Sequence, residues 1–126
     1  MDETPKAEGG KTNAEVRQWY LTQVARIPEL NEQWIQQGLS AQARAEAAWR
    51  IRHDARLVAR AMMADPVEIE LLRARDLAKY GHPDGPAFEF LVEQCRKAGL
   101  EGEAVYEAII DGSYRTNVAV DKRLDL

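Results

Sequence analysis

The sequence predicts an all-α fold: a compact bundle of six or seven helices joined by short connections. Two observations support this prediction. Apolar residues recur at spacings of three and four along most of the chain, which is the pattern of amphipathic helices. The eight glycines and five prolines fall where that pattern places helix ends, and no long window alternates like a half-buried strand. We therefore expect a flexible N-terminal tail over residues 1–11 and a single helical domain over residues 12–126.

A capping box and a proline mark the first two predicted helices. Thr12 and Glu15 have the spacing of a capping box, so a helix should begin beside them. Pro28 cannot lie in a helix interior and should break or kink the chain at that point. A short second helix should then carry Trp34 and end at Gly38.

The longest predicted helix covers about residues 41–64 and begins after Ser40, a favourable N-cap. Its apolar stripe consists of Ala47, Ile51, Ala55, Val58 and Met62. The exposed face is expected to carry Arg44, Arg52, Arg56 and Arg60. Because the last three arginines are four residues apart, they would form a basic ridge that meets phosphates or an acidic partner. A solvated row of charges is the simpler interpretation.

The next predicted helix starts at Asp65 and Pro66, an N-cap followed by proline at the first helical position. It should run to about Tyr80 and end at Gly81, because glycine adopts the left-handed conformation of a helix C-terminus without steric cost. One side of this helix is apolar and consists of Val67, Leu71, Ala74 and Ala78.

Three further helices are expected in the last third of the chain. Pro86 should open the first of them, whose apolar stripe consists of Phe88, Leu91, Val92 and Cys95. The second should cover residues 102–111 and end at Gly112. The last should begin at Thr116 and carry Val118, Val120 and Leu124.

The charge balance and the hydropathy pattern exclude several classes of function. The 126 residues include 17 Lys and Arg against 21 Asp and Glu, a formal net charge of -4. This acidic balance disfavours nucleic acid and anionic lipid as partners. No apolar run approaches the ~20 residues of a membrane span, and the N-terminus lacks the pattern of a signal peptide. We therefore expect no membrane association and a cytoplasmic protein, or one exported without a cleavable signal peptide.

Sequence motifs for metals and cofactors are missing. There is no His-Glu-x-x-His motif, no EF-hand loop and no pair of cysteines. The single Cys95 cannot form an internal disulfide and is interpreted as a small buried side chain. His53 lies between apolar positions and is interpreted as a residue at the edge of the core. We expect no metal ion and no cofactor.

The segment from Tyr80 to Pro86 is the strongest candidate for a catalytic site. Two glycines and two prolines make it stiff, and stiff polar loops often carry function. His82 would act as general acid or base and Asp84 would orient it, as in a metal-independent ribonuclease. The cations that would hold an anion are Arg75, Lys79 and Arg115. In the simpler interpretation, Asp84 binds backbone amides and Lys79 complements the helix dipole.

Two tryptophans and the basic ridge are the candidate residues for binding a protein partner. Trp19 and Trp34 would serve as anchors if they are exposed, since aromatic residues are enriched at protein interfaces. The ridge would add Arg52, Arg56 and Arg60, because arginine is enriched there too.

Two segments, RARDLAKYGHPDGP over residues 73–86 and VYEAIIDGSYRTN over residues 105–117, resemble uncharacterised helical modules near the C-termini of bacterial secreted effector and polymorphic-toxin proteins. The resemblance covers about residues 56–120 and implies a setting but no catalytic residue. The leading hypothesis is a helical protein–protein interaction module in such an effector or toxin system. The alternative is a small metal-independent toxin enzyme, for example a ribonuclease, using residues 75–86. A nucleic-acid binder ranks third, because the acidic balance opposes it.

Overall fold

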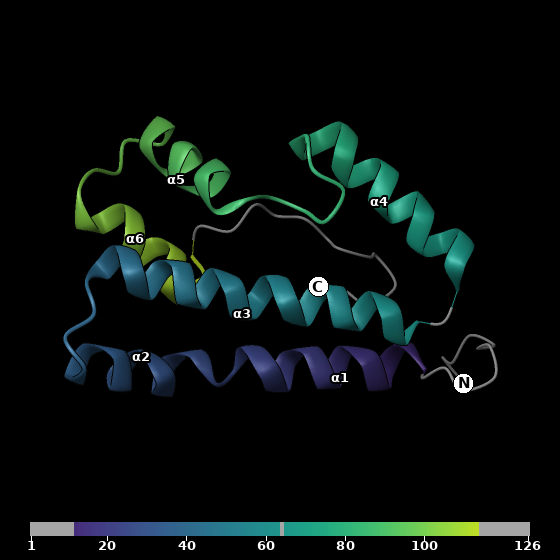
Figure 1. Ribbon diagram of the computed structural model, residues 1–126, viewed down its shortest axis with the longest axis horizontal. Helices are drawn as coiled ribbons and strands as arrows, with labels where there is room; N and C mark the ends of the chain where they lie inside the picture. The colour runs from purple at the N-terminus through teal and green to yellow at the C-terminus, as the bar shows by residue number, and fades with distance from the viewer. Residues whose placement is uncertain (1–11, 64, 114–126) are drawn as a thin grey trace.

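The structure, a computed structural model, describes residues 12–63 and 65–113. These residues form only helices: α1 (Asn13–Val24), α2 (Ile27–Gln36), α3 (Ala41–Met62), α4 (Pro66–Tyr80), α5 (Phe88–Lys97) and α6 (Glu103–Asp111). The all-α prediction is confirmed for this part of the chain. α1 and α2 are separated only by residues 25 and 26 and follow one line (Figure 1). Counted together as one bent element, they leave five helical elements in the described residues, fewer than the predicted six or seven. The expected tail over 1–11 and the expected helix from Thr116 lie outside the described residues.

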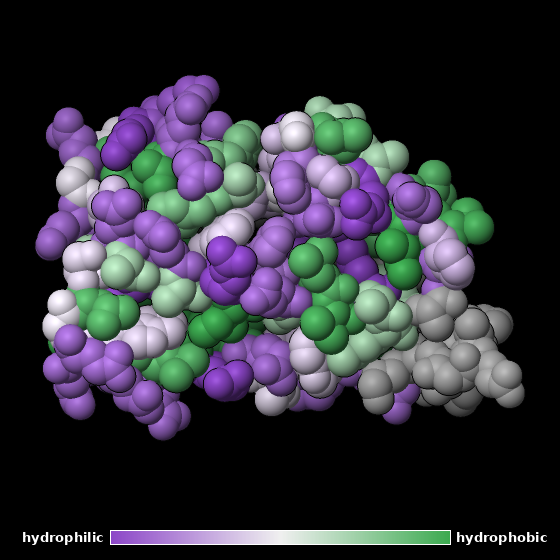
Figure 2. All heavy atoms as spheres, viewed as in Figure 1, coloured by the Kyte–Doolittle hydropathy of each residue, from purple (hydrophilic) through white to green (hydrophobic). Residues whose placement is uncertain are grey.

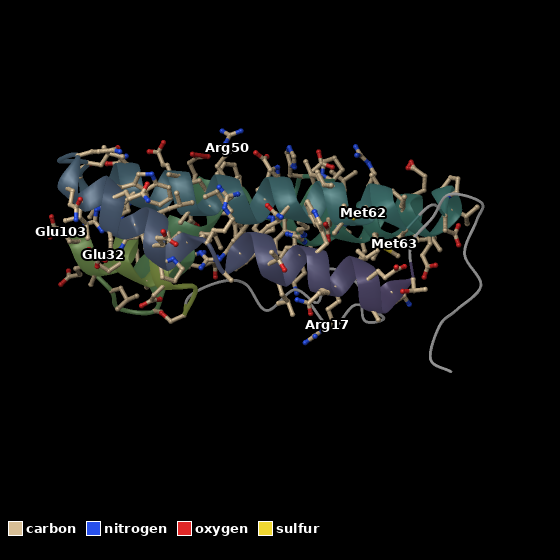
Figure 3. All side chains as sticks on the ribbon, turned by 90° about the horizontal axis from the view of Figure 1, so that it is seen from below. Arg17, Glu32, Arg50, Met62, Met63 and Glu103 are labelled. Atoms are coloured by element: carbon tan, nitrogen blue, oxygen red, sulfur yellow. The ribbon has the colours of Figure 1, made fainter. Side chains whose placement is uncertain are left out.

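The helices form three layers around α3, as Figure 1 shows. The line of α1 and α2 lies along one side of α3, and α4 and α5 lie on its other side. α6 packs along α3 and also contacts α2. The backbones of α1, α2 and α6 approach α3 closely, and α5 packs on α6, whereas α4 stands farther from α3. At the periphery, Arg17 on α1 and Arg50 on α3 point away from the bundle on opposite sides (Figure 3).

Side-chain caps begin the helices at the predicted residues. The amide of Glu15 donates to Thr12 Oγ1 at 3.2 Å, and the amide of Thr12 donates to Glu15 Oε1 at 2.8 Å, which completes the capping box. Ser40 and Asp65 accept amide hydrogen bonds at the starts of α3 and α4. Such caps satisfy amides that have no partner within the helix.

Two helix boundaries differ from the prediction by two residues. α3 ends at Met62 rather than near residue 64, and α5 begins at Phe88 rather than at Pro86. Ala87, in an extended conformation, is the N-cap of α5. The carbonyl of Pro86 instead accepts a hydrogen bond from Trp49, and this contact holds Pro86 outside the helix. The predicted break before Pro28 is confirmed, since α1 ends at Val24 and α2 begins at Ile27.

Two apolar clusters form the core. The first joins α3 to α5 and α6 and consists of Ala45, Phe88, Leu91, Val92, Cys95, Val105, Ile109 and Ile110. The second joins α1, α3 and α4 and consists of Val16, Tyr20, Ala55, Ala59, Met63 and Leu72. Small alanines supply the α3 side of both clusters, so neighbouring helices can approach its backbone closely. None of the helices in residues 12–63 and 65–113 is both long and apolar enough to cross a membrane.

The predicted orientation of α3 is wrong. Of the expected apolar stripe only Ala55 is buried, and Val58 is 43% exposed. The buried positions are instead Ala41, Ala45, Ala48, Ala55, Arg56, Ala59 and Arg60. The prediction assigned arginine to solvent by its charge. In the structure two arginines are buried, and their guanidinium groups bind acceptors on other elements.

Candidate functional site

A row of four arginines on α3 organises the layer formed by α4, α5 and α6. The row consists of Arg44, Arg52, Arg56 and Arg60, and we call it the arginine row. Arg52, Arg56 and Arg60 are four residues apart and share one face of α3. Arg44, about two turns before Arg52, lies farther round the helix. Arg56 and Arg60 are only 7% and 2% exposed. The predicted exposed ridge of Arg52, Arg56 and Arg60 is thus an inward-facing row, and a partner cannot reach its two innermost members in this packing.

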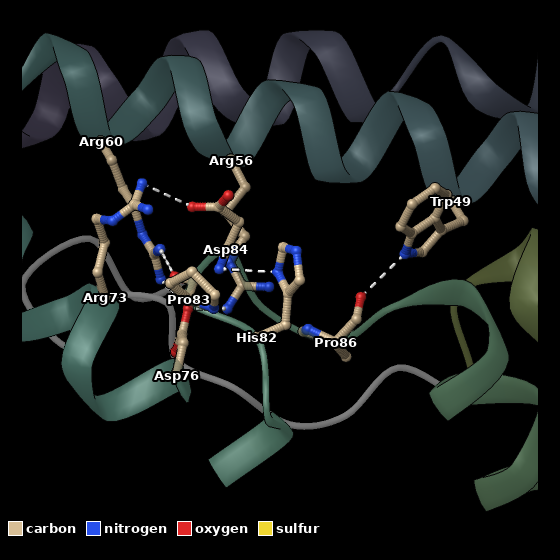
Figure 4. A network of polar contacts seen from close by, with 9 residues as sticks. All are labelled: Trp49, Arg56, Arg60, Arg73, Asp76, His82, Pro83, Asp84 and Pro86. Atoms are coloured by element: carbon tan, nitrogen blue, oxygen red, sulfur yellow. Dashed lines mark hydrogen bonds and ion pairs between the residues drawn. The ribbon is translucent and has the colours of Figure 1, made fainter. Parts of the chain in front are cut away.

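Asp76 of α4 is the counter-charge of the row. Its side chain is 1% exposed, and its Oδ2 accepts from Arg56 Nη2 at 3.2 Å and from Arg60 Nη2 (Figure 4). Burial lowers the pKa of the Arg56 guanidinium, and the Asp76 carboxylate opposes that shift. Asp76 Oδ1 has no hydrogen-bond partner among the described residues. Two cations therefore share one buried carboxylate, and that carboxylate connects α3 to α4.

The connection between α4 and α5, residues 81–87, is fixed on α3 at three points. Arg60 Nη1 donates to the carbonyl of Pro83 at 3.4 Å, and Trp49 Nε1 donates to that of Pro86 at 3.1 Å (Figure 4). Gly85, at φ +96°, lies against Arg56, so that an added Cβ would be 2.2 Å from Arg56 Nη1. The predicted stiff loop is therefore a strap bound to the arginine row.

The proposed catalytic pair does not form as predicted. The carboxylate of Asp84 pairs with Arg73 at 2.9 Å, and its contact with His82 is through the backbone: the amide of Asp84 donates to His82 Nδ1 at 3.1 Å. The Asp84 amide therefore holds the His82 ring within the turn, while the Asp84 carboxylate is bound to Arg73. His82 itself is exposed.

The predicted anion-binding cations are not gathered around His82. Arg75 and Lys79 are exposed on α4, and the Lys79 ammonium lies 5.5 Å from the centre of the Tyr80 ring. Arg115 lies outside the described residues. The ion pair of Asp84 is with Arg73 instead. This arrangement is that of a stable turn and lacks the geometry of an acid–base pair.

The remaining arginines of the row hold other helices. Arg52 donates to the carbonyls of Ile109 and Ile110 at 2.7 and 3.0 Å, at the C-terminal end of α6. The Ile109 carbonyl also accepts from the Gly112 amide at 3.3 Å, and Arg52 adds to this cap at a helix end, where the last carbonyls lack the regular helical partner. Arg44 donates to Asn31 of α2 at 3.0 Å and forms an ion pair with Glu107 of α6 at 3.1 Å.

The two predicted tryptophan anchors are half-buried. Trp19 packs against the cluster of α1, α3 and α4, and Trp34 is half-buried on α2. Trp49 was not among the predicted site residues, yet its indole binds the strap and stacks on His53 with ring centres 4.9 Å apart. Asp76 was also not identified as a central residue. The feature of the sequence that pointed to Asp76 was a series of arginines four residues apart without a counter-charge beside them.

Burial shifts two further titratable groups. It lowers the pKa of His53 below its ordinary value of 6.5, an effect that the Asp54 carboxylate opposes. Burial also raises the pKa of the Cys95 thiol, which lies in the apolar cluster of α5 and α6. A neutral buried thiol is a poor nucleophile, so the predicted role of Cys95 as a small apolar side chain fits its position.

A surface hollow of about 490 Å³ lies between α3 and α5. It is lined by Glu46, Ala47, Trp49, Arg50, Phe88 and Glu89. The hollow is open and its charged groups are of both signs, so it selects no ligand class. In the described residues, no group of three or more His, Cys, Asp or Glu side chains is placed to hold a metal ion.

The outward side of α4 exposes more large apolar side chains than any other described helix. Val67 is 71% exposed and Leu71 is 66% exposed, and Ala74 and Ala78 between and beyond them are exposed as well. We call these four residues the outer face of α4; Leu77, 52% exposed, lies at its edge. Figure 2 shows hydrophobic side chains, in green, along the edge of the molecule over α4. The apolar side that the sequence assigns to this helix is therefore the side that faces solvent.

Comparisons with known proteins give no relative: no family model matches the chain, and no curated protein and no solved structure matches it significantly.

Proposed function

We propose that the protein is a helical interaction module that binds a protein partner through the outer face of α4. The observation that carries this proposal is the position of that face. Val67, Leu71, Ala74 and Ala78 form a continuous apolar stripe on a helix, and the described part of the bundle leaves it uncovered. A contiguous exposed apolar stripe usually marks a binding surface, because water contact with it is unfavourable.

The packing of α4 supports this proposal. The inner side of α4 contributes Leu72 to the core and Asp76 to the arginine row. The arginine row and the strap thus hold the helix in place while its apolar side remains available. A helix that presents residues at spacings of three and four is a common recognition element between proteins. The bacterial effector or toxin setting suggested by residues 56–120 remains part of the proposal.

The enzymatic alternative has less support. It requires His82 and Asp84 to act as a pair, and the Asp84 carboxylate is bound to Arg73. Binding to nucleic acid through the basic ridge also has less support, because Arg56 and Arg60 are buried against Asp76.

Photo-crosslinking from the outer face of α4 tests the interaction function. A photoreactive amino acid is placed at Val67, or at exposed Gln36 of α2 as control, in the full chain produced in cells of its own species. We expect a discrete protein adduct from position 67 and none of comparable yield from position 36. The adduct from position 67 should disappear with Leu71→Glu and persist with Leu71→Met. Equal, diffuse labelling from both positions would overturn the proposal.

A further inference from the structure

The described helices differ in how much apolar surface they expose. Within residues 12–63 and 65–113, six large hydrophobic side chains are substantially exposed, and three of them, Val67, Leu71 and Leu77, lie on α4. The other three lie singly on α1, α2 and α3. Isolated exposed apolar residues are common on protein surfaces, whereas a row on one helix face indicates a partner. The row on α4 therefore indicates that a partner covers this helix.

The outer face of α4 has the geometry of one side of a helix pair. Its residues are spaced by four, three and four, the spacing of a coiled-coil seam, and they extend over about 16 Å of helix. Val67 and Leu71 are large and occupy the first half, whereas Ala74 and Ala78 are small and occupy the second half. An antiparallel copy of the same helix places large residues opposite small ones along the whole stripe. A parallel copy places large opposite large and small opposite small.

The charges beside the outer face also differ between the two halves of α4, as the side-chain sizes do. Glu68, Arg75 and Lys79 are separated by seven and four residues and therefore lie along one flank of the stripe. The acid lies in the first half of the helix and both bases lie in the second half. In an antiparallel helix pair, equivalent flanks face each other. Centring the pair between Leu71 and Ala74 brings Glu68 of each copy opposite Arg75 and Lys79 of the other.

We propose that a second copy of this chain covers the outer face of α4 by packing its own α4 antiparallel against it. This inference rests on the proposed function, because it names the partner of the same surface. Size complementarity and charge complementarity both select an antiparallel copy. The twofold symmetry of such a pair makes every contact twice, as in most homodimers. Antiparallel alignment also brings the positive end of each helix dipole beside the negative end of the other.

Sedimentation equilibrium of the full chain measures the self-association directly. A single pair of helices buries less area than a standard interface, so we expect a dimer with a dissociation constant on the order of micromolar. Leu71→Glu should weaken it about 100-fold, because a carboxylate would be buried in the apolar stripe. Val58→Glu, a change at another exposed apolar residue, should leave the dimer intact. Circular dichroism should show that both variants remain helical.

Charge-swapped chains test the flank. A chain with Arg75→Glu and Lys79→Glu has an all-acidic flank, and a chain with Glu68→Lys has an all-basic one. Each alone should associate at least about tenfold more weakly than the unchanged chain, because like charges would face each other across the interface. An equimolar mixture should recover a mixed dimer. Two variants that dimerise as well alone as together would contradict the predicted contacts.

Cysteine pairs test the direction of the helices. A mixture of Val67→Cys and Ala78→Cys chains should form a mixed disulfide under mild oxidation. Val67→Cys alone should not, because two copies of position 67 lie about 16 Å apart along an antiparallel pair. A disulfide that forms best between two copies of position 67 would overturn the antiparallel arrangement. Native Cys95 is buried and does not compete.

The outcomes separate this inference from the proposed function. A chain that remains monomeric at several hundred micromolar overturns the homodimer. If position 67 then still crosslinks to a different protein, the interaction function stands with another partner. If position 67 gives no specific adduct and the chain is monomeric, both proposals fail.

Discussion

The helices that cover the upper side of α3 are held in two different ways. α5 and α6 pack on α3 through the apolar cluster around Cys95 and Ile109, and their buried sides are the apolar sides that the sequence shows. Leu72 is the only apolar side chain of α4 that is fully buried, and the helix is held besides by the Asp76 carboxylate, by the Arg73–Asp84 pair and by the contact of the Tyr80 and Phe90 rings. Its apolar stripe faces outward.

This difference shows that the hydrophobic side of a helix need not be its inner side. Burying charged groups is costly unless they are paired and hydrogen-bonded, and the arginine row provides both conditions at Asp76. With its inner side held by Leu72 and by polar contacts, α4 leaves its apolar stripe exposed to solvent, and this stripe is where we propose that a partner binds. The apolar sides of α5 and α6, in contrast, are buried within the bundle.

The largest effect is expected from removing Asp76. Asp76→Ala should lower the free energy of unfolding by about 3–5 kcal/mol, because it leaves Arg56 and Arg60 buried without a counter-charge. Asp84→Ala removes the partly exposed pair with Arg73 and should cost less than about 1 kcal/mol. Urea denaturation measures both. Equal losses in the two variants would mean that Asp76 does not anchor α4.

The apolar packing of α5 and α6 on α3 should lose stability when a substitution creates a cavity in it. Ile109→Ala should cost about 3 kcal/mol, because Ile109 is 2% exposed and the deleted atoms leave a void against α3. Val67→Ala, measured at low protein concentration, should change stability by no more than about 0.5 kcal/mol, since Val67 already faces water. The same denaturation experiment compares them. A large loss for Val67→Ala would show that the outer face of α4 contacts the rest of the chain.

A side chain at Gly85 should destabilise the packing of the strap on α3. Gly85→Ala should cost about 2 kcal/mol, because the left-handed backbone is strained for alanine and the new Cβ meets the Arg56 guanidinium. Gly99→Ala is a matched control: its φ of +95° is nearly the same, but nothing lies within 4 Å of the added Cβ. The difference between the two, measured by thermal or urea unfolding, reports the arginine contact. Identical losses would show that Arg56 moves aside freely.

The smallest effect concerns His53. Because burial lowers its pKa in the folded chain, the unfolded chain takes up a proton first as the pH falls through about 6.5. Folding stability should therefore decline more between pH 7.5 and pH 5.5 in the unchanged chain than in His53→Gln. Urea unfolding at the two pH values measures this difference. The same decline in both chains would contradict a lowered pKa.

Much of the fold follows from local chemistry. The capping box at Thr12, the N-caps at Ser40 and Asp65, and the left-handed glycine at Gly81 fix helix ends through contacts within a few residues. Such contacts depend on neighbours along the chain, so the sequence reveals them. The stripe of α5 was also predicted correctly, because its buried residues are apolar without exception.

The candidate site could not be predicted in this way. Asp76, Arg56 and Arg60 come from two helices, and each would be assigned to solvent if it were considered alone. The proposed use of His82 and Asp84 depended on their closeness in sequence, whereas Arg73 decides where the Asp84 carboxylate lies. Interactions between distant residues are set by packing, which the local pattern does not contain.

The sequence by itself determined that the regular segments between residues 13 and 111 would be helices, where most of these helices begin and end, and that α4 would have one apolar side. Only the tertiary structure decided which sides face inward. The reason is that a buried arginine is stable when an acceptor from another helix meets it, and that acceptor is supplied by the fold. Asp76 supplies it here, and the apolar side of α4 faces outward as a result.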